Sequence, residues 1–440
     1  MMTLREYLQL KNGTDVRGIA TEGIAGEEVN LTPEAAEAIA EAFAEWLCRR
    51  TGKSPLRIAV GHDSRISAPA LSESVLKGIE RTGNVAIFTH LSSTPSMFML
   101  LKDERWSADG SVMITASHLP FNRNGLKFFT AEGGLESEDI KEILTLASEA
   151  PFPEKAGGSR IEKPYLDAYA QDLVEKVRRA TGEAQPLKGK RILVDAGNGA
   201  GGFYVDQVLK PLGADTTGSQ FLEPDGRFPN HIPNPENEAA MQSVCKATLE
   251  NHADLGVIFD TDVDRAGCVD HSGNEINRNR LVALAACIAL EGNEGGTIVT
   301  DSITSSGLKA FIERDLGGKH HRFKRGYKNV IDEAQRLTAQ GINTPLAIET
   351  SGHAALRENY FLDDGAYLMT KIIIKMAQLG KSGKHLEDLI AMLEEPLEIR
   401  EFRMPITCEE FKPYGEHVIE TVASYAEAQS AWQIAPDNHE

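Results

Sequence analysis

The chain has 440 residues, 41% of them hydrophobic and 25% charged, a composition typical of globular domains and not of disordered or fibrous chains. Its 46 Lys and Arg residues against 65 Asp and Glu residues give a formal net charge of −19, which argues against binding to nucleic acid or an anionic membrane. The five cysteines are scattered without CxxC spacing, which argues against a disulfide framework or a zinc site and fits a reducing compartment.

The first third of the chain predicts alternating helices and strands. The N-terminus lacks the apolar core of a signal peptide and no apolar run approaches membrane-spanning length, so we expect a cytoplasmic protein. "LTPEAAEAIAEAFAEWLCRR" predicts a helix capped by Thr32. The strand "LRIAVGHDSR", a helix over Leu71–Arg81 and a strand over Asn84–Phe88 follow. This alternation is typical of an α/β layer with a largely parallel sheet.

The next motif, "MITASHLPFNRNGLKFF", places Ser117 and Lys127 on a turn-rich loop between two strand-like runs. One interpretation is an ordinary surface turn, because Ser, Asn and Gly favour turns. The other is a nucleophile that a substrate can reach. A hydrolase triad is disfavoured because GxSxG is absent, and the adjacent His118 is badly placed to act as the base for Ser117.

A second α/β round follows the linker-like segment 149–160. In it, "RILVDAGNGAGG" is a strand leading into a turn that formally matches GxGxxG, with Glu223 about twenty residues on, where a ribose-binding acid would sit. A dinucleotide-dependent oxidoreductase therefore stays open as a distant alternative. Asp195, directly before the turn, is unusual for a nucleotide loop.

The same round contains "ADLGVIFDTDVDR", in which the apolar run Leu255–Phe259 leads to Asp260, Asp262 and Asp264. Alternate residues of an extended chain point the same way, so the three carboxylates converge. A divalent metal relieves their repulsion, and an oxygen-only ligand set suits Mg²⁺. A solvated acidic turn is the alternative. A dehalogenase-type aspartyl phosphatase fits poorly, because that motif has Thr or Val where this chain has Asp264.

A third round, after a plausible break at 271–280, contributes two more loops. "FKRGYKN" places Lys324, Arg325 and Lys328 in one basic turn, which suits either a phosphate or plain solvation. In "ETSGH", Glu349, Ser351 and His353 fall on alternate positions and suit the hydroxyls of a sugar, although a loop with a helix cap fits as well. Beyond Gly380 we predict a helix over 385–394 and a strand over 397–404.

In this order the motifs resemble the α-D-phosphohexomutase family, the phosphomannomutases and phosphoglucomutases, over nearly the whole chain. "TASHLP" resembles the phosphoserine loop, "NGLKF" the segment after it, "DTDVDR" the metal loop and "ETSGH" the sugar-recognition loop. "GTDVRG", "GHDSR", "DAGNGAGG" and "FPNHIPNPEN" are also similar to family segments. The resemblance implies three related α/β domains with mixed sheets and a partial C-terminal α+β domain, in a heart-shaped arrangement around a central cleft. The expected boundaries are 1–155, 156–272, 273–380 and 381–440.

The resemblance also implies a reaction. Ser117 would carry a phosphoryl group, transfer it to a hexose phosphate and recover the other phosphate from a bisphosphosugar. Mg²⁺ would bind phosphorylated Ser117, Asp260, Asp262 and Asp264, and hexose 1,6-bisphosphate would be the activator. Expected partners are small hexose phosphates, with no nucleic acid or membrane, and the protein would be a monomer or homodimer.

The remaining residues take roles from the same resemblance. Lys127 would be the general acid or base, its pKa lowered by an Arg-rich cleft. His118 and Arg17 would hold the transferred phosphate, and Arg265 would brace the sugar or phosphate. Glu349 and Ser351 would bind sugar hydroxyls, and His353 would assist proton transfer.

Four departures from the family pattern stand out. Leu119, Tyr327 and Thr350 replace residues usual in the family, and no Arg/Ser/Asn/Thr phosphate loop follows Glu395. We therefore expect either that the chain is truncated or that Lys324 and Arg325 hold the non-reacting phosphate. The alternative function is a weakly active or non-catalytic relative that binds sugar phosphate.

Overall fold

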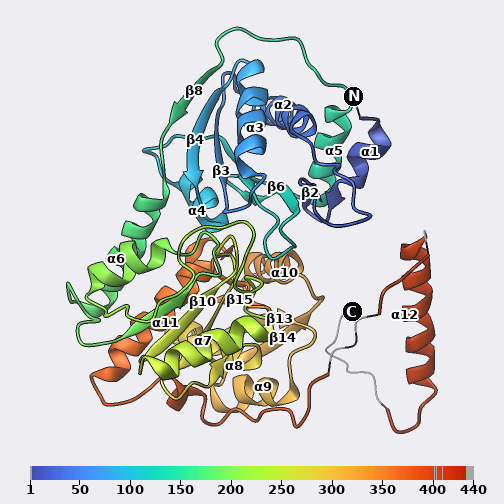
Figure 1. The fold of residues 1–440 in the computed structure, drawn as a ribbon. Coiled ribbons are helices and arrows are strands. Elements are labelled where there is room, and N and C mark those ends of the chain that lie inside the picture. The colour runs from blue at the N-terminus through green and yellow to red at the C-terminus, as the bar shows by residue number, and fades with distance from the viewer. Residues whose placement is uncertain (1, 401, 403, 409, 433–440) are drawn as a thin grey trace.

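The structure is a computed structural model that describes residues 2–400, 402, 404–408 and 410–432. The described residues form three mixed β-sheets with helices packed against them, as predicted. The first sheet and its helices make the upper lobe of Figure 1, and the other two sheets lie together in the lower lobe. Loops from both lobes meet at the junction, which is where the predicted site residues lie.

The first sheet has the strand order β1-β2-β6-β5-β3-β4-β8, with β7 paired to β6. Strand β3 runs parallel to β4 and β5, whereas β6 runs antiparallel to β2 and β5, so the sheet is more mixed than the alternation predicted. Its strands are β1 (Lys11–Asn12), β2 (Asp15–Ile19), β3 (Arg57–His62), β4 (Val85–Leu91), β5 (Gly110–Ile114), β6 (Arg123–Thr130), β7 (Gly133–Gly134) and β8 (Ser159–Glu162).

The helices of this lobe pack their apolar residues against the first sheet. Thr32 caps α2 by accepting a hydrogen bond from the backbone N–H of Ala35 at 3.2 Å, which confirms the predicted cap. Ile39, Phe43 and Leu47 are fully or almost fully buried in one core with α3 and α5. The helices of this lobe are α1 (Leu4–Gln9), α2 (Pro33–Thr51), α3 (Ala68–Arg81), α4 (Thr94–Met99) and α5 (Ser137–Ala147).

The second and third sheets share one hydrophobic core. Their strand orders are β12-β11-β10-β9 and β14-β13-β15-β16-β17. The core joins buried residues of α6, α8 and α11 to both sheets. The strands are β9 (Ile192–Asp195), β10 (Leu255–Phe259), β11 (Ala266–Asp270), β12 (Glu275–Ile276), β13 (Thr297–Asp301), β14 (Lys319–Phe323), β15 (Leu346–Ile348), β16 (Ala354–Leu356) and β17 (Leu362–Asp363). The helices are α6 (Leu166–Thr181), α7 (Glu238–Glu250), α8 (Asn279–Leu290), α9 (Ser306–Ala310), α10 (Tyr327–Ala339) and α11 (Gly365–Gly380).

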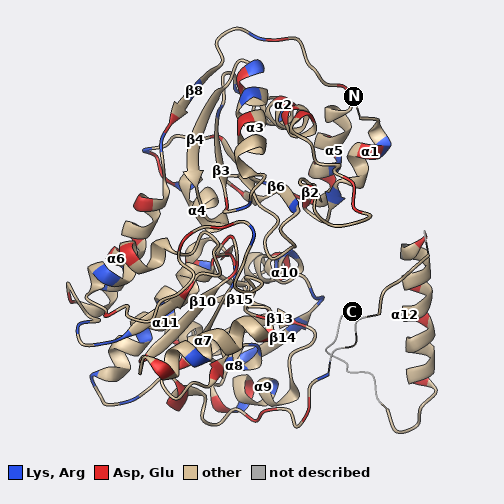
Figure 2. Ribbon diagram, in the orientation of Figure 1, with Lys and Arg blue, Asp and Glu red and all other residues tan. Residues whose placement is uncertain are grey.

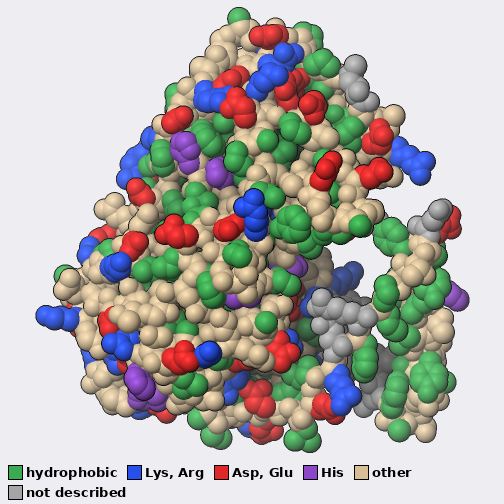
Figure 3. All heavy atoms as spheres, in the orientation of Figure 1, with side chains coloured by type: hydrophobic (Ala, Val, Ile, Leu, Met, Phe, Trp, Pro, Cys, Tyr) green, Lys and Arg blue, Asp and Glu red, His purple; other side chains and the backbone are tan. Residues whose placement is uncertain are grey.

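The C-terminal prediction is wrong in part. In place of the helix predicted over 385–394, the structure has a short 3-10 helix, Glu387–Ile390. The side chains of Leu386 and Ile390 are buried and hold this segment against the core. The described residues of the strand predicted over 397–404 form no strand, and residues 401 and 403 lie outside the described residues. Helix α12 (Phe411–Glu427) stands apart from the two lobes (Figure 1), and hydrophobic side chains line it in Figure 3.

Charged residues of both signs are interspersed along the outer helices and also lie on the loops between the lobes (Figure 2). Of the helices that the structure describes, none is both long enough and apolar enough to cross a membrane.

Candidate active site

Ser117 lies in the loop that follows β5, in a left-handed backbone conformation with φ of 50°. Its backbone N–H donates to Thr115 Oγ1 at 2.9 Å, and its side-chain hydroxyl donates to Asp260 Oδ2 at 2.9 Å. A non-glycine residue in this conformation is uncommon and is often found at functional sites. The loop therefore points the serine hydroxyl at the acidic loop of the second sheet.

Arg65 holds the serine loop in this shape. Its guanidinium donates to the carbonyl of Ser117 and to those of Leu119 at 2.7 Å, Pro120 at 2.7 Å and Arg123 at 2.8 Å. The guanidinium also lies 3.3 Å from the buried carboxylate of Asp63.

The carboxylate of Asp63 also contacts the serine loop, because it accepts a hydrogen bond from Thr115 Oγ1 at 2.6 Å. Burial raises the pKa of Asp63 to about 6 despite the attraction of Arg65. Asp63 and Arg65 stand in "GHDSR", but the sequence assigned no role to either residue. The only signal was a carboxylate and a cation at the end of an apolar strand.

Asp260, Asp262 and Asp264 converge in the loop after β10, as predicted, with ligand oxygens within 4.8 Å of one another. Oδ1 of Asp262 and Oδ1 of Asp264 are buried and have no hydrogen-bond partner. Burial and the neighbouring Asp264 carboxylate raise the pKa of Asp260 well above its usual range. Unpartnered buried carboxylate oxygens are costly unless a cation binds them, so the residues present fit a divalent metal with oxygen ligands.

The acidic loop, which carries Asp260, Asp262 and Asp264, is held in place by hydrogen bonds from two sides. Val263 has φ of 67°, unfavourable for a β-branched residue, and its carbonyl accepts from the N–H of Gly365 at 3.1 Å. Thr94, at the start of α4, donates its hydroxyl to Asp262 Oδ2 and its backbone N–H to the Asp262 carbonyl at 2.8 Å. Nothing in the sequence singled out Thr94, because its partner lies in another domain.

Lys127 reaches the same carboxylates from β6. Its Nζ lies 2.5 Å from Asp264 Oδ2 and 3.3 Å from Asp262 Oδ2. Burial alone would lower the pKa of Lys127, but these two carboxylates outweigh it and raise the pKa well above the usual value. The expected lowering of the Lys127 pKa by an Arg-rich cleft is therefore wrong for this arrangement, in which the two carboxylates favour the charged ammonium.

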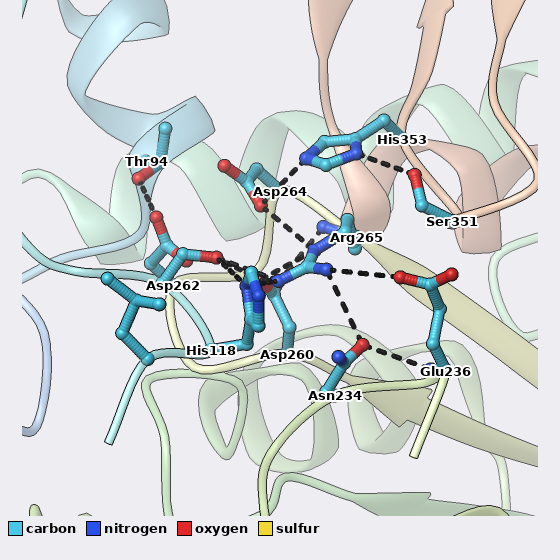
Figure 4. A network of polar contacts seen from close by, with 12 residues as sticks. Thr94, His118, Asn234, Glu236, Asp260, Asp262, Asp264, Arg265, Ser351 and His353 are labelled. Atoms are coloured by element: carbon cyan, nitrogen blue, oxygen red, sulfur yellow. Dashed lines mark hydrogen bonds and ion pairs between the residues drawn. The ribbon is translucent and has the colours of Figure 1, made fainter. Parts of the chain in front are cut away.

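Arg265 lies at the centre of the polar network (Figure 4). Its Nη2 lies 2.8 Å from Ser117 Oγ, 2.6 Å from His118 Nδ1 and 3.0 Å from Asp260 Oδ2. Burial together with the charges of Arg265 and Arg17 lowers the pKa of His118 to about 3, so neutral His118 accepts from Arg265. Arg17 donates to the Ala116 carbonyl at 3.0 Å, directly behind Ser117.

The "ETSGH" loop interlocks with the acidic loop, because Arg265 and His353 form an antiparallel β-bridge. His353 Nδ1 lies 2.9 Å from Ser351 Oγ, and its Nε2 lies 3.7 Å from Asp264 Oδ1. Burial opposes protonation of His353, but Asp363 and Glu349 outweigh it and raise its pKa. The loop thus turns the His353 imidazole toward Asp264, with the Ser351 hydroxyl on the other ring nitrogen.

The basic turn "FKRGYKN" contacts the "ETSGH" loop. The Gly326 N–H donates to Glu349 Oε1 at 2.6 Å, and the Tyr327 ring stacks on His353 with centroids 5.2 Å apart. Lys324 is exposed, and Arg325 Nη2 lies 3.9 Å from a carboxylate oxygen of Glu236, which in turn faces Arg265. Arg325 is therefore linked to Arg265 through Glu236, and Lys324 directly precedes it in the turn.

The Gly-rich turn "GNGAGG" supports the acidic loop. The Ala200 N–H donates to the Thr261 carbonyl at 2.8 Å, and a Cβ on Gly199 would lie 2.6 Å from that oxygen. Asp195 binds His231 at 2.9 Å and accepts a hydrogen bond from the Gly197 N–H at 2.9 Å. The glycines serve close packing between loops, which removes the reason for the dinucleotide interpretation.

A cavity of about 200 Å³ extends the site between the two lobes, lined in part by Lys127, Asp264, Tyr327 and Asp363. Burial raises the pKa of Asp363 to about 7, and its Oδ2 is buried without a hydrogen-bond partner. Sequence reasoning missed Asp363, since "LDDG" resembles an ordinary helix start.

The chain matches three consecutive family descriptions: "Phosphoglucomutase/phosphomannomutase, alpha/beta/alpha domain I" over residues 9–154, domain II over 164–273 and domain III over 277–396. It is 31% identical to a phosphoglucomutase of Neisseria gonorrhoeae, covering 96% of this chain and 85% of the relative. It is also 31% identical to a phosphomannomutase/phosphoglucomutase of Pseudomonas putida, covering 83% and 76%.

A solved structure agrees with this assignment. A phosphoglucomutase/phosphomannomutase family protein from Burkholderia thailandensis matches with a TM-score of 0.73 and 25% identity, over 90% of this chain and 81% of that chain. The order of the serine, metal and sugar loops, their convergence and these matches lead to one conclusion. This chain belongs to the phosphoglucomutase/phosphomannomutase family, the α-D-phosphohexomutases.

Proposed function

We propose that this protein is a phosphohexomutase that interconverts hexose 1-phosphate and hexose 6-phosphate, with glucose or mannose as the sugar. The observation that carries the proposal is the position of Ser117 Oγ, 2.9 Å from Asp260 Oδ2 and 2.8 Å from Arg265 Nη2. A hydroxyl between a metal-binding carboxylate and a fixed guanidinium is placed to accept and release a phosphoryl group.

Asp260, Asp262, Asp264 and phosphorylated Ser117 would hold the metal ion, which we propose is Mg²⁺. When bound, Mg²⁺ neutralises charge on the transferred phosphoryl group. Arg265 and Arg17 supply fixed positive charge beside Ser117, and neutral His118 helps to orient Arg265. Their positions are set before substrate arrives, so little reorganisation is needed during transfer.

Proton transfer at the sugar falls to Lys127. When a sugar phosphate gives its phosphoryl group to Ser117, Ser117 Oγ bonds to phosphorus and its hydroxyl proton passes to Asp260 Oδ2, which already accepts its hydrogen bond. The phosphorus–oxygen bond to the sugar breaks, and protonated Lys127 donates to the leaving oxygen. In the opposite direction the sugar hydroxyl attacks phosphorus, the bond to Ser117 Oγ breaks, Ser117 regains its proton from Asp260, and the proton of the sugar hydroxyl returns to Lys127, with His353 assisting. Glu349 and Ser351 bind sugar hydroxyls, and hexose 1,6-bisphosphate primes Ser117.

A coupled mutase assay tests this function. With Mg²⁺ and catalytic hexose 1,6-bisphosphate, we expect turnover of glucose 1-phosphate or mannose 1-phosphate, with glucosamine 1-phosphate as the comparison sugar. Chelation should stop turnover, and added Mg²⁺ should restore it. Tight binding of sugar phosphate without turnover would instead support the non-catalytic alternative.

Lys324 and Arg325 provide a second anion site in this proposal. Replacing both by alanine should raise KM for hexose phosphate by about tenfold to a hundredfold, the equivalent of one hydrogen bond to a charged group, with a smaller effect on kcat. Lys210→Ala with Lys246→Ala is the matched control, since it removes the same charge from exposed helix pairs. An equal KM in the two double variants would contradict this assignment.

A further inference from the structure

Two histidines and a glutamate come together away from the active site. His271 lies in the turn between β11 and β12, and His385 and Glu387 lie in the segment that follows α11. Candidate ligand atoms of the three side chains all lie within 4.8 Å of one another. His271 Nδ1 is 2.8 Å from Glu387 Oε1, and the two imidazole rings stack with centroids 4.6 Å apart.

The backbone on both sides of this cluster is fixed. The buried Asp270 accepts hydrogen bonds from the N–H groups of Ser272 and Asn274, both at 2.9 Å, which sets the turn that carries His271. On the other side, the His385 N–H donates to Asp388 Oδ2 at 2.8 Å. Leu386, between the two other ligands, is only 4% exposed and ties that segment to the core.

A second hydrogen-bonding group lies at the other ring nitrogen of His271. Without a metal, Nδ1 carries a proton and donates it to Glu387 Oε1 at 2.8 Å. When an ion binds between Nδ1 and Glu387, the proton on Nε2 can be donated to Ser272 Oγ, which lies 3.3 Å from Nε2. Outer partners that fix the tautomer in this way are typical of metal-binding histidines.

The donor types separate this cluster from the three aspartates of the active site. Imidazole nitrogens with one carboxylate suit Zn²⁺ and related transition metals, whereas Mg²⁺ prefers oxygen ligands. The cysteine spacing excludes only a cysteine-based zinc site, and the ligands of this cluster are two histidines and a glutamate. Both histidines are exposed and Glu387 is partly exposed, so an ion can enter from solvent.

We propose that His271, His385 and Glu387 bind one divalent transition-metal ion of the zinc class, with water as a further ligand. The ion fastens the segment after α11 to the β11–β12 turn. It thereby supports the second sheet, whose metal loop Asp260–Asp264 directly precedes β11. The site is independent of the phosphohexomutase reaction and requires no step of it.

The test is a Zn²⁺ titration of the full chain against a chromogenic chelator, with Mg²⁺ in excess to occupy the aspartate site. We expect one Zn²⁺ per chain, bound at least about tenfold more weakly by His271→Ala and by His385→Ala. His417→Ala, which removes an exposed histidine from α12, is the matched control and should bind like the unchanged protein. Glu387→Gln keeps the side-chain size and should also weaken binding.

Two further readouts distinguish a metal site from a folding defect. Co²⁺ should give the intense visible bands of a nitrogen-containing tetrahedral site in the unchanged protein, and these should disappear in His385→Ala. Mutase activity in Mg²⁺ should stay within twofold in all four variants, which shows that each one folds. Zn²⁺ affinities that are equal in the unchanged protein, His271→Ala, His385→Ala and Glu387→Gln would overturn the proposal, as would Co²⁺ bands that survive in His385→Ala.

Discussion

Asp262→Asn should lower kcat/KM for hexose phosphate by about 10²- to 10³-fold and should raise the Mg²⁺ concentration needed for half-maximal activity at least about tenfold. Asp262 is fully buried, its Oδ1 has no hydrogen-bond partner, and its Oδ2 lies beside Lys127. The amide keeps the shape but removes one anionic metal ligand. Kinetics over a range of Mg²⁺ concentrations measure both effects.

Asp270→Asn is the matched control for this experiment. Asp270 is also a buried aspartate of the second sheet, but its carboxylate caps the β11–β12 turn and lies outside the aspartate cluster. It should alter stability without changing the Mg²⁺ concentration at half-maximal activity. An Asp262→Asn enzyme with an unchanged Mg²⁺ response would contradict the proposed metal site.

Arg65→Met should lower the free energy of unfolding by about 3–5 kcal/mol, because it leaves the buried carboxylate of Asp63 without its cation. It also removes the donor to four carbonyls of the segment that carries Ser117. Mutase activity should therefore fall even at temperatures where the variant is folded. Urea unfolding and mutase kinetics on the same preparation measure the two losses.

Arg49→Met gives the comparison for Arg65, because its side chain is 59% exposed and pairs with Glu45 one helical turn away. Its effect on unfolding should stay within about 0.5 kcal/mol, as for ordinary surface substitutions. Equal destabilisation by the two changes would mean that the serine loop does not depend on Arg65.

The sequence indicated the residues that meet in the candidate site better than it indicated the residues that hold them in place. Ser117, the three aspartates and "ETSGH" stand in short contiguous motifs that follow strands, where an α/β sheet places its loops. The α/β layers and the cap at Thr32 also followed from local pattern, whereas the antiparallel pairing of β6 with β2 and β5 did not. These features depend on residues near one another in the chain, which is the information that pattern reasoning uses.

Features that depend on distant partners were missed or misjudged. Asp262 and Asp264 raise the pKa of Lys127. The sequence did not indicate this effect, because the two carboxylates come from another sheet. Thr94 gains its role only by meeting Asp262 across the domain boundary. The helix predicted over 385–394 gave way to a short turn whose position is set by the burial of Leu386 and Ile390.

Transfer of a phosphoryl group to Ser117 is the central claim, and intact-mass measurement tests it most directly. After incubation with hexose 1,6-bisphosphate and Mg²⁺, the protein should carry one phosphoryl group, located on the peptide that contains Ser117. Ser117→Ala should carry none and should lose mutase activity. A Ser117→Ala protein that still acquires the phosphoryl group and turns over hexose phosphate at the unchanged rate would contradict the account.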